Sequence, residues 1–141
     1  MFMTQYKKIM VSLVGDGSEK VVIQHAVEIK NKLDASLVVI HVNDPHAGEM
    51  SMMMESPKEI TEDMIRDQIS EYGFGQILRD LDVIITENNS IAEAINEFSQ
   101  KCDMLIVGHR KMSTFKSHIM DSVDEGIVNK TKCPVLVVQK D

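Results

Sequence analysis

The stretch that decides the fold is Asp103-Met104-Leu105-Ile106-Val107-Gly108. Its apolar residues follow one another without a break, between a carboxylate and a glycine. A strand with one solvated face alternates polar and apolar side chains, whereas a short continuous apolar run indicates a strand buried on both faces. Such strands are typical of parallel sheets covered by helices on both sides. The stretch therefore predicts a strand over Met104–Val107.

Similar apolar runs recur on either side of this stretch, and helical patterns separate them. The further predicted strands are Ile9–Val14, Ser36–Val42, Leu81–Thr86 and Pro134–Val138. One apolar stripe and a set of capping boxes predict the helices between them. The stripe is Val22, Ala26, Ile29 and Leu33, and the capping boxes begin at Ser56, Ser90 and Ser122. Gly73-Phe74-Gly75 predicts a break in the helix that follows Ser56.

The alternation of strands and helices predicts one doubly wound α/β domain over residues 1–141. We expect a flavodoxin-like or Rossmann-like parallel sheet of five strands in the order 3-2-1-4-5, with helices on both faces. Ligands of such folds bind outside the carboxyl ends of the strands, near the point where the strand order reverses. The functional surface is therefore expected at those ends.

The composition argues against several classes of function. The net charge is −7, and an acidic chain repels phosphates, so we expect neither nucleic acid nor a membrane as a partner. The apolar runs are far shorter than the ~20 residues of a membrane span, and no apolar signal segment precedes Ile9. Cys102 and Cys133 are too few for a disulfide framework and are expected to be buried free thiols. These features predict a cytoplasmic protein.

The segment after Val107 has the composition of an anion site. It begins Gly108-His109-Arg110-Lys111, and a helix is predicted to start near Asp121-Ser122-Val123. A glycine turn, basic residues and the amides at a helix start together favour a bound anion. The plainer interpretation is that Ser122 only caps its helix, and the local residues alone favour that one.

The chain resembles the universal stress proteins. The resemblance is carried by residues 103–108, by Ser122-Val123, by the closing Cys133-Pro134-Val135-Leu136-Val137-Val138, and by the opening Tyr6–Val14. It covers nearly the whole chain except the stretch Asn43–Ser56. It implies a dimeric stress-response protein, and the family contains both members that bind ATP and members that do not.

The nucleotide-binding members resemble one another in a loop of the form G-x2-G-x9-G-[ST]. This chain keeps Gly108 and Ser122, but it has Lys111 and Asp121 at the other two glycine positions. The resemblance also places Val14 where those members have an adenine-contacting aspartate. It implies the following nucleotide-binding positions, if a nucleotide binds at all: Val14, Gly15, Asp16, Val42, Gly108, Arg110, Lys111, Ser122 and Val123.

These departures predict weak binding of ATP or none. Val14 cannot accept a hydrogen bond from the base, and Asp121 adds a negative charge beside the phosphates. Arg110 and Lys111 act in the opposite direction, because both attract phosphate. We therefore expect no bound cofactor. ATP with magnesium is the one ligand that these residues leave as an alternative.

The last predicted strand is an expected dimer interface. In the order 3-2-1-4-5 it lies at an edge, and an unpaired apolar edge invites pairing with another chain. The resemblance also implies a homodimer through this strand. The expected interface residues are Pro134, Val135, Leu136, Val137 and Val138. Further protein partners are expected but are not identified by the sequence.

A methionine-rich segment supports a different hypothesis. Thioethers and imidazoles can hold Cu(I), which would make this a metal-handling protein. The residues concerned are His41, His46, Met50, Met52, Met53 and Met54. Their spacing is irregular, so we favour an adaptable apolar flap and expect no metal site.

The sequence contains no recognisable catalytic constellation. Ser18 is not in a nucleophile elbow, no carboxylate is placed to orient His109, and Asp16 and Glu19 are expected to serve the start of the first helix. We therefore favour a non-enzymatic interaction protein with a degenerate nucleotide site. An ATP- or AMP-binding switch with at most slow hydrolysis is the alternative, and the metal-handling protein is a lesser one.

Overall fold

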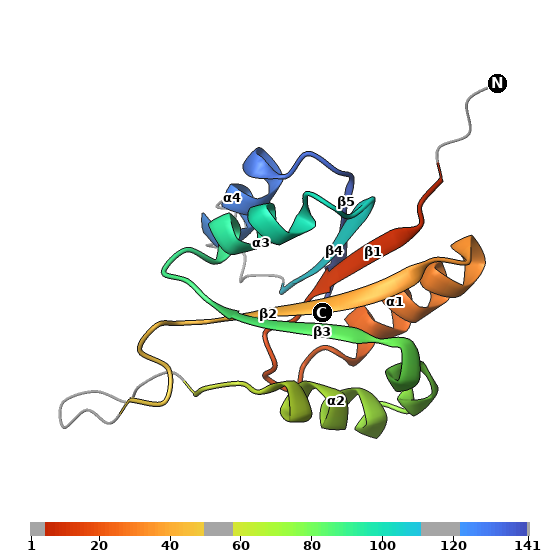
Figure 1. Cartoon of the computed structure of the whole chain (residues 1–141), viewed down its shortest axis with the longest axis horizontal. Helices are drawn as coiled ribbons and strands as arrows, with labels where there is room; N and C mark the ends of the chain where they lie inside the picture. The colour runs from red at the N-terminus through yellow and green to blue at the C-terminus, as the bar shows by residue number, and fades with distance from the viewer. Residues whose placement is uncertain (1–4, 50–57, 111–121, 141) are drawn as a thin grey trace.

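The computed structural model describes residues 5–49, 58–110 and 122–140 (Figure 1). Its strands are β1 Lys8–Ser12, β2 Ser36–Asn43, β3 Asp82–Glu87, β4 Met104–His109 and β5 Val135–Gln139. Its α-helices are α1 Lys20–Leu33, α2 Glu62–Glu71, α3 Ile91–Ser99 and α4 Ser122–Lys130, and η1 Gly75–Asp80 is a 3₁₀ helix.

The strands form one parallel sheet in the order β3-β2-β1-β4-β5. β1 pairs with β2 on one side and with β4 on the other, so the strand order reverses between β1 and β4. The carboxyl ends of these two strands therefore border the crevice where such folds bind ligands. The doubly wound α/β class and the strand order are both confirmed.

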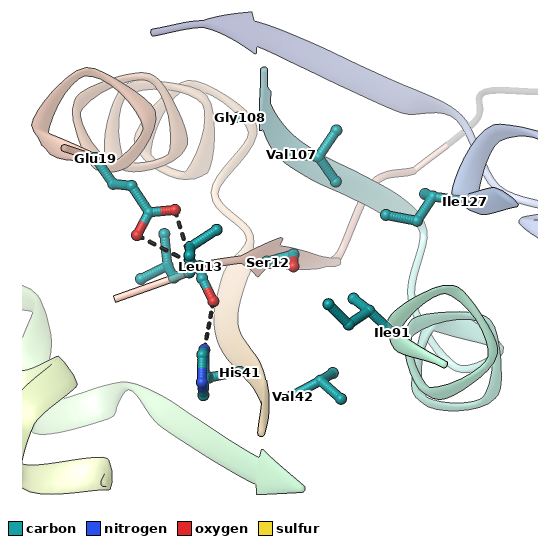
Figure 2. Close-up of a pocket in the computed structure, with 10 residues that line it drawn as sticks. Ser12, Leu13, Glu19, His41, Val42, Ile91, Val107, Gly108 and Ile127 are labelled. Atoms are coloured by element: carbon teal, nitrogen blue, oxygen red, sulfur yellow. Dashed lines mark hydrogen bonds between the residues drawn. The ribbon is translucent and has the colours of Figure 1, made fainter. Parts of the chain in front are cut away.

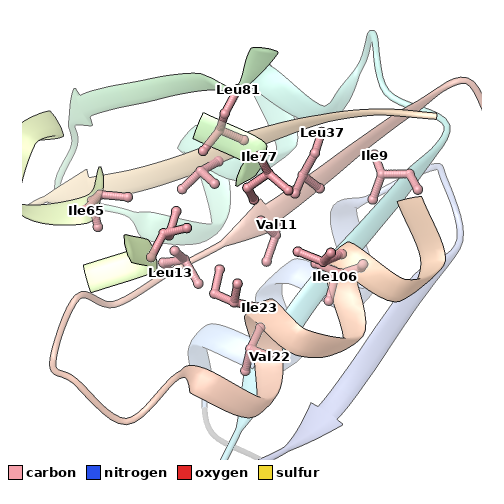
Figure 3. Packing of buried hydrophobic residues seen from close by; sticks show 14 of the residues in the cluster. Ile9, Val11, Leu13, Val22, Ile23, Leu37, Ile65, Ile77, Leu81 and Ile106 are labelled. Atoms are coloured by element: carbon pink, nitrogen blue, oxygen red, sulfur yellow. The ribbon is translucent and has the colours of Figure 1, made fainter. Parts of the chain in front are cut away.

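The two faces of the sheet carry different pairs of helices. α1 and α2 cover one face, where Ile23 and Ile65 are fully buried in one cluster with Val11 and Ile106 of the sheet (Figure 3). α3 and α4 cover the other face, as Figure 1 shows. Their buried residues there are Ala92, Ala94, Ile95 and Ile127. The continuous apolar runs are explained, because every central strand packs against helices on both sides.

β1 ends earlier than the sequence predicts. The apolar run extends to Val14, but the strand stops at Ser12. Leu13 still donates its amide to the Ile40 carbonyl at 3.0 Å, and Val14 is 57% exposed. The last two residues of the run thus belong to the turn that leads into α1, and this turn forms part of the candidate site.

Two expectations about helices are wrong in detail. The helix predicted to start at Ser56 begins only at Glu62, with the Thr61 hydroxyl accepting from the Met64 amide at 3.3 Å. Lys58–Ile60 are not helical, and Ser56 lies outside the described residues. The sequence predicts Leu33 on the buried stripe of α1, yet it is 42% exposed because the helix ends there in a left-handed Asp34.

Two other expectations are confirmed. The Ser90 hydroxyl accepts from the Glu93 amide at 3.2 Å and caps α3. The break after α2 occurs at Gly73, whose φ of +94° suits glycine, and η1 begins at Gly75.

The two thiols lie at the opposite end of the sheet from the candidate site. Cys102 and Cys133, which precede β4 and β5, are both free, and Cys102 is the more buried. Burial raises the pKa of both thiols, which keeps them protonated and poorly nucleophilic. Within the described ranges, no helix combines the length and apolarity that crossing a membrane requires.

Candidate functional site

A small cavity opens at the carboxyl ends of β1 and β4 (Figure 2). Its volume is about 150 Å³, and its lining is mainly apolar. The apolar lining residues include Leu13, Val42, Ile91, Val107 and Ile127. Polar groups come from Ser12, Glu19 and His41. The cavity therefore lies where the topology predicts a ligand, but it is smaller than the ~300 Å³ at which ligand pockets begin.

The turn after β1 folds around the carboxylate of Glu19. This side chain is 1% exposed. Its oxygens accept from the Val14 amide at 2.8 and 3.0 Å and from the Gly15 amide at 2.9 Å. Gly15 makes the turn possible, because its φ is +81° and a Cβ there would lie 3.1 Å from Ile60. Glu19 thus supplies, from within the chain, the anion that these amides bind.

Some neighbours of Glu19 raise the pKa of its carboxyl group and others lower it. Burial is the largest influence and raises the pKa of the carboxyl above its ordinary value of 4.5. The amides of Val14 and Gly15 and the charge of Lys140 lower that pKa, but they do not fully offset the burial. Glu19 is therefore a carboxyl group whose ionisation lies closer to neutral pH than that of an exposed glutamate.

His41 approaches the same turn from β2. Its Nδ1 lies 2.7 Å from the Leu13 carbonyl, and its Nε2 lies 3.0 Å from Oδ1 of Asn43. Asn43 is in turn held by Ile60, since its amide donates to the Ile60 carbonyl at 2.9 Å and its Oδ1 accepts from the Ile60 amide at 3.0 Å. This network ties β2 and the segment before α2 to the end of β1.

Gly108 at the end of β4 is required by packing. A Cβ at this position would lie 2.8 Å from Cγ2 of Val22 and 3.0 Å from Cδ of Lys140. Val22 is completely buried, so it cannot move away. The glycine therefore lets α1 and the chain after β5 approach β4, whatever else it does for a ligand.

A basic group lies beside these turns. Lys140 donates from Nζ to the Ser18 hydroxyl at 3.3 Å, and the Ser18 hydroxyl and amide both bond to Oδ1 of Asp16. Burial alone would raise the pKa of Asp16, but these Ser18 hydrogen bonds, with the charges of Lys140 and Arg110, lower it. Asp16 is thus an ionised carboxylate that partly neutralises the cations an anionic ligand would use.

Comparison with known proteins identifies the family. The model of the universal stress protein family matches residues 5–139 of this chain. The chain belongs to the universal stress protein family.

Two solved universal stress proteins and one relative by sequence illustrate the relationship. A universal stress protein of Methanocaldococcus jannaschii is 26% identical, with 96% of this chain and 83% of the relative aligned. A universal stress protein solved in complex with cAMP has a TM-score of 0.72 at 19% identity, over 98% of this chain and all of that one. Another, from Archaeoglobus fulgidus, has a TM-score of 0.64 at 20% identity, covering 94% and 93%. At such identities the structural likeness bears on the fold.

The structure brings some of the positions implied by universal stress proteins together. Val14, Val42 and Gly108 line one cavity, although the Val14 side chain is more than half exposed. Arg110 and Asp16 are both exposed, and Asp16 is not among the residues that line the cavity. Lys111 and Asp121 lie outside the described residues. Ser122 and Val123 open α4, and their side chains are likewise outside the described part of the structure.

Sequence reasoning did not identify the two titratable groups that line the cavity. The sequence predicts that Glu19 serves the start of α1, but its side chain makes no capping bond and turns back to the residues before it. For His41 the sequence predicts only a place on the second strand or, under the metal hypothesis, a role as a ligand. The signal available in the sequence was a glutamate a few residues after a glycine at a strand end, which also fits an ordinary helix start.

The two histidines of the metal hypothesis contact different groups of the chain. Both ring nitrogens of His41 face oxygen atoms of the chain, and His46 contacts Glu49 at 3.2 Å. Over the described ranges, no three His, Cys, Asp or Glu side chains gather as a metal site would require. Met50, Met52, Met53 and Met54 lie outside those ranges.

Proposed function

We propose that this universal stress protein acts in the cytoplasm through protein interactions, as a homodimer, and that its nucleotide site is largely closed to ATP. The family supports a role in stress response. The acidic composition and the few cysteines support the cytoplasmic assignment.

The observation that carries the proposal is the bond between Glu19 and the amides of Val14 and Gly15. Free amides at a turn after a strand can bond to acceptor atoms of a ligand. Here a buried carboxylate of the same chain accepts from both of them. A nucleotide whose base lies at the end of β1 would have to displace this carboxylate or bring its own negative charge near it.

The shape of the cavity supports the same conclusion. Its volume of about 150 Å³ is small for a nucleotide, and apolar side chains form most of its lining. At the end of β1, where a hydrogen-bond acceptor would recognise the base, Val14 offers an exposed isopropyl group. The described residues of the site therefore provide little that would select ATP.

Calorimetry with ATP and magnesium, on protein shown to be free of nucleotide, tests this proposal. We expect a dissociation constant of about 100 μM or weaker. Glu19→Ala should bind more tightly because it frees the amides and removes a charge. Glu28→Ala is the matched control, since Glu28 is an exposed carboxylate of the same helix. A micromolar constant for the wild type, or equal behaviour of the two variants, would contradict the proposal.

A nucleotide-binding switch is the second candidate. Two observations favour it, namely the solved relative in complex with cAMP and the cations Arg110 and Lys140 beside the crevice. A cyclic monophosphate carries less charge than ATP and would be repelled less by Glu19. The same calorimetric experiment with cAMP distinguishes the candidates, because micromolar binding of cAMP would favour the switch.

The proposed dimer would form along the outer edge of β5. The Pro134 carbonyl and the Lys140 amide both bond to β4. In a parallel ladder, alternate residues face the same neighbour. Val135, Val137 and Gln139 therefore turn their backbone groups towards the open edge of the described sheet. This edge can pair with the same strand of a second copy.

Val137→Lys tests the dimer by sedimentation. The Val137 side chain is 41% exposed, so the substitution should preserve the fold while placing a charge on the pairing edge. Leu33→Lys is the control, because Leu33 has the same character and is 42% exposed at the end of α1. We expect a dimeric wild type, a dimeric control and a monomeric Val137→Lys. A monomeric wild type at micromolar concentration would refute the interface.

A further inference from the structure

A second cavity lies at the amino ends of β4 and β5, at the opposite end of the sheet from the first. Its volume is about 230 Å³, compared with about 150 Å³ for the first cavity. The end of α3 and the segment between α4 and β5 supply most of its walls. The lining residues are Asn96, Ser99, Gln100, Cys102, Lys132 and Cys133. Both cysteines of the chain therefore line one cavity.

The two thiols lie on the same side of the sheet. Cys102 follows α3 and Cys133 follows α4, each just before the next strand. The strands pair in parallel, with Leu105 beside Val135, so the segments that precede them also run side by side. Both cysteines belong to the hydrophobic cluster between the sheet and the pair α3 and α4, which cover the same face in Figure 1. Ionisation of Cys133 would raise the pKa of Cys102, as expected of neighbouring sulfur atoms.

Cationic side chains lie near the thiols. Lys132 lines the cavity, and the charge of Lys8 lowers the pKa of Cys102, although burial raises that pKa by more. Asp103 acts on Cys102 in the opposite direction. Its carboxylate is already engaged, because Oδ2 accepts from the amides of Lys7 and Lys8 at 2.8 and 2.9 Å. A complex with a single negative charge would therefore find compensating charge beside it.

Two neighbouring thiols are suitable ligands for a soft metal ion. Thiolates select Cu(I) among the metals of the cell, and this closed-shell ion is satisfied by two sulfur ligands. One Cu(I) ion and two thiols give a bis-thiolate complex with one negative charge, and two protons leave to solvent. No three His, Cys, Asp or Glu side chains gather within the described ranges, which leaves too few ligands for a four-coordinate zinc site.

We propose that Cys102 and Cys133 form a two-coordinate site for Cu(I) in the cavity at the amino ends of β4 and β5. The cavity provides the space that an ion beside the two sulfur atoms needs. Lys8 and Lys132 offset the charge of the complex, and the bound ion bridges the segment before β4 to the segment before β5. The site lies at the other end of the sheet from the first cavity, so it is independent of the proposed function.

Copper competition under anaerobic conditions tests the site on the reduced full chain. Cu(I) is titrated against the chelator bicinchoninate, and we expect one ion per chain with two sulfur ligands in its X-ray absorption spectrum. Loss of an outer-shell group already costs about 10- to 100-fold in metal affinity, so loss of one of two ligands should cost more than about 100-fold. Cys102→Ser and Cys133→Ser should each show this loss.

The two serine variants differ in their risk to the fold. Cys102 is buried, whereas Cys133 is partly exposed, so Cys133→Ser is the variant expected to keep the native circular dichroism spectrum. A wild type that takes no Cu(I) from the chelator, or a folded Cys133→Ser with unchanged affinity, would overturn the proposal.

Methionine variants control for the other soft ligands of the chain. Met104→Leu removes a thioether that lies close to Cys102 in sequence but packs in the cluster on the other face of the sheet. A combined variant replaces the methionine-rich segment and carries Met50→Leu, Met52→Leu, Met53→Leu and Met54→Leu. Both variants should bind Cu(I) as the wild type does. Loss of the ion in the combined variant, with both cysteines present, would place the copper elsewhere and overturn the proposal.

Thermal unfolding gives a second readout. An ion that binds the folded chain more tightly than the unfolded one stabilises the fold. One equivalent of Cu(I) should therefore raise the Tm of the wild type by about 5 °C or more and leave that of Cys133→Ser unchanged. Equal Tm values of the wild type with and without the ion would mean that the fold does not hold the two thiols ready for it, which would also contradict the site.

Discussion

The turn after β1 and the end of β4 border the same cavity, but the glycine in each has a different structural role. After β1, Gly15 adopts a positive φ and lets a buried carboxylate collect backbone amides. At the end of β4, Gly108 makes room for Val22 and for the stem of Lys140. The first turn is organised by electrostatics and the second by packing.

The difference shows that a motif residue and a functional residue need not coincide. Gly108 matches the family's loop, yet packing alone is sufficient to require a glycine there. Glu19 matches no motif, yet it determines which backbone donors a ligand could reach. Lys140 joins the two regions, because its stem packs at Gly108 and its ammonium group reaches Ser18.

The largest expected effect is the loss of the Glu19 carboxylate. Glu19→Ala leaves the Val14 and Gly15 amides without their acceptor in a buried turn and should lower the free energy of unfolding by about 3 kcal/mol. Glu28→Ala, on the exposed side of α1, should change it by less than about 0.5 kcal/mol. Urea denaturation measures both. If the two variants are equally stable, electrostatics does not organise the first turn.

A smaller effect is expected at the end of β4. Gly108→Ala places a methyl group 2.8 Å from the fully buried Val22 side chain and should cost about 2 kcal/mol. Gly75→Ala is the control, because the nearest atom to its Cβ would be at an ordinary 3.5 Å. The combination Gly108→Ala with Val22→Ala should recover part of the loss. An additive double variant would mean that this contact is not the reason for the glycine.

The fold could be predicted from the sequence because it depends on patterns that span many residues. The uninterrupted apolar run in β4 and its counterparts required a parallel sheet covered on both sides, which is the observed arrangement. The errors of the prediction concern the ends of strands and helices. The apolar character of Leu13 and Val14 predicts that β1 extends to Val14. In the structure β1 ends at Ser12, and the Val14 amide bonds to the Glu19 carboxylate instead of continuing the sheet.

The sequence predicts where the site lies, but not which side chains organise it. Strand order placed it at the ends of β1 and β4, and the cavity lies there. The roles of Glu19 and His41 depend on backbone groups, namely the amides of Val14 and Gly15 and the carbonyl of Leu13. Every residue carries such groups, so the sequence does not reveal which of them a side chain will meet.

The pH dependence of stability gives a sharper test of the first turn. Burial raises the pKa of Glu19 in the folded protein, so the folded state binds this proton more tightly than the unfolded state. Stability from this group is therefore present below the ordinary value of 4.5 and is lost as the pH rises through the raised value. Relative to Glu19→Gln, the wild type should lose stability with increasing pH, by at most about 1.4 kcal/mol per pH unit. Denaturation from about pH 4 to about pH 8 measures the difference, and a flat difference would contradict it.

The smallest expected effect concerns Lys140, which connects the two regions. Lys140→Met keeps an unbranched stem beside Gly108 and removes the charge near Asp16. The folded-state pKa of Asp16 is lowered, so its stabilising contribution is present above the ordinary value of 3.8 and is lost as the pH falls. Without Lys140 that pKa should rise, while the unfolding free energy at neutral pH changes by less than about 0.5 kcal/mol because Asp16 is exposed to solvent. Carboxyl resonances followed through an acid titration measure the shift, with Lys101→Met as the control on an exposed lysine. If Asp16 titrates identically in both variants, the hydrogen bonds from Ser18 and the charge of Arg110 lower its pKa without Lys140, and Lys140 links the two turns only through its stem.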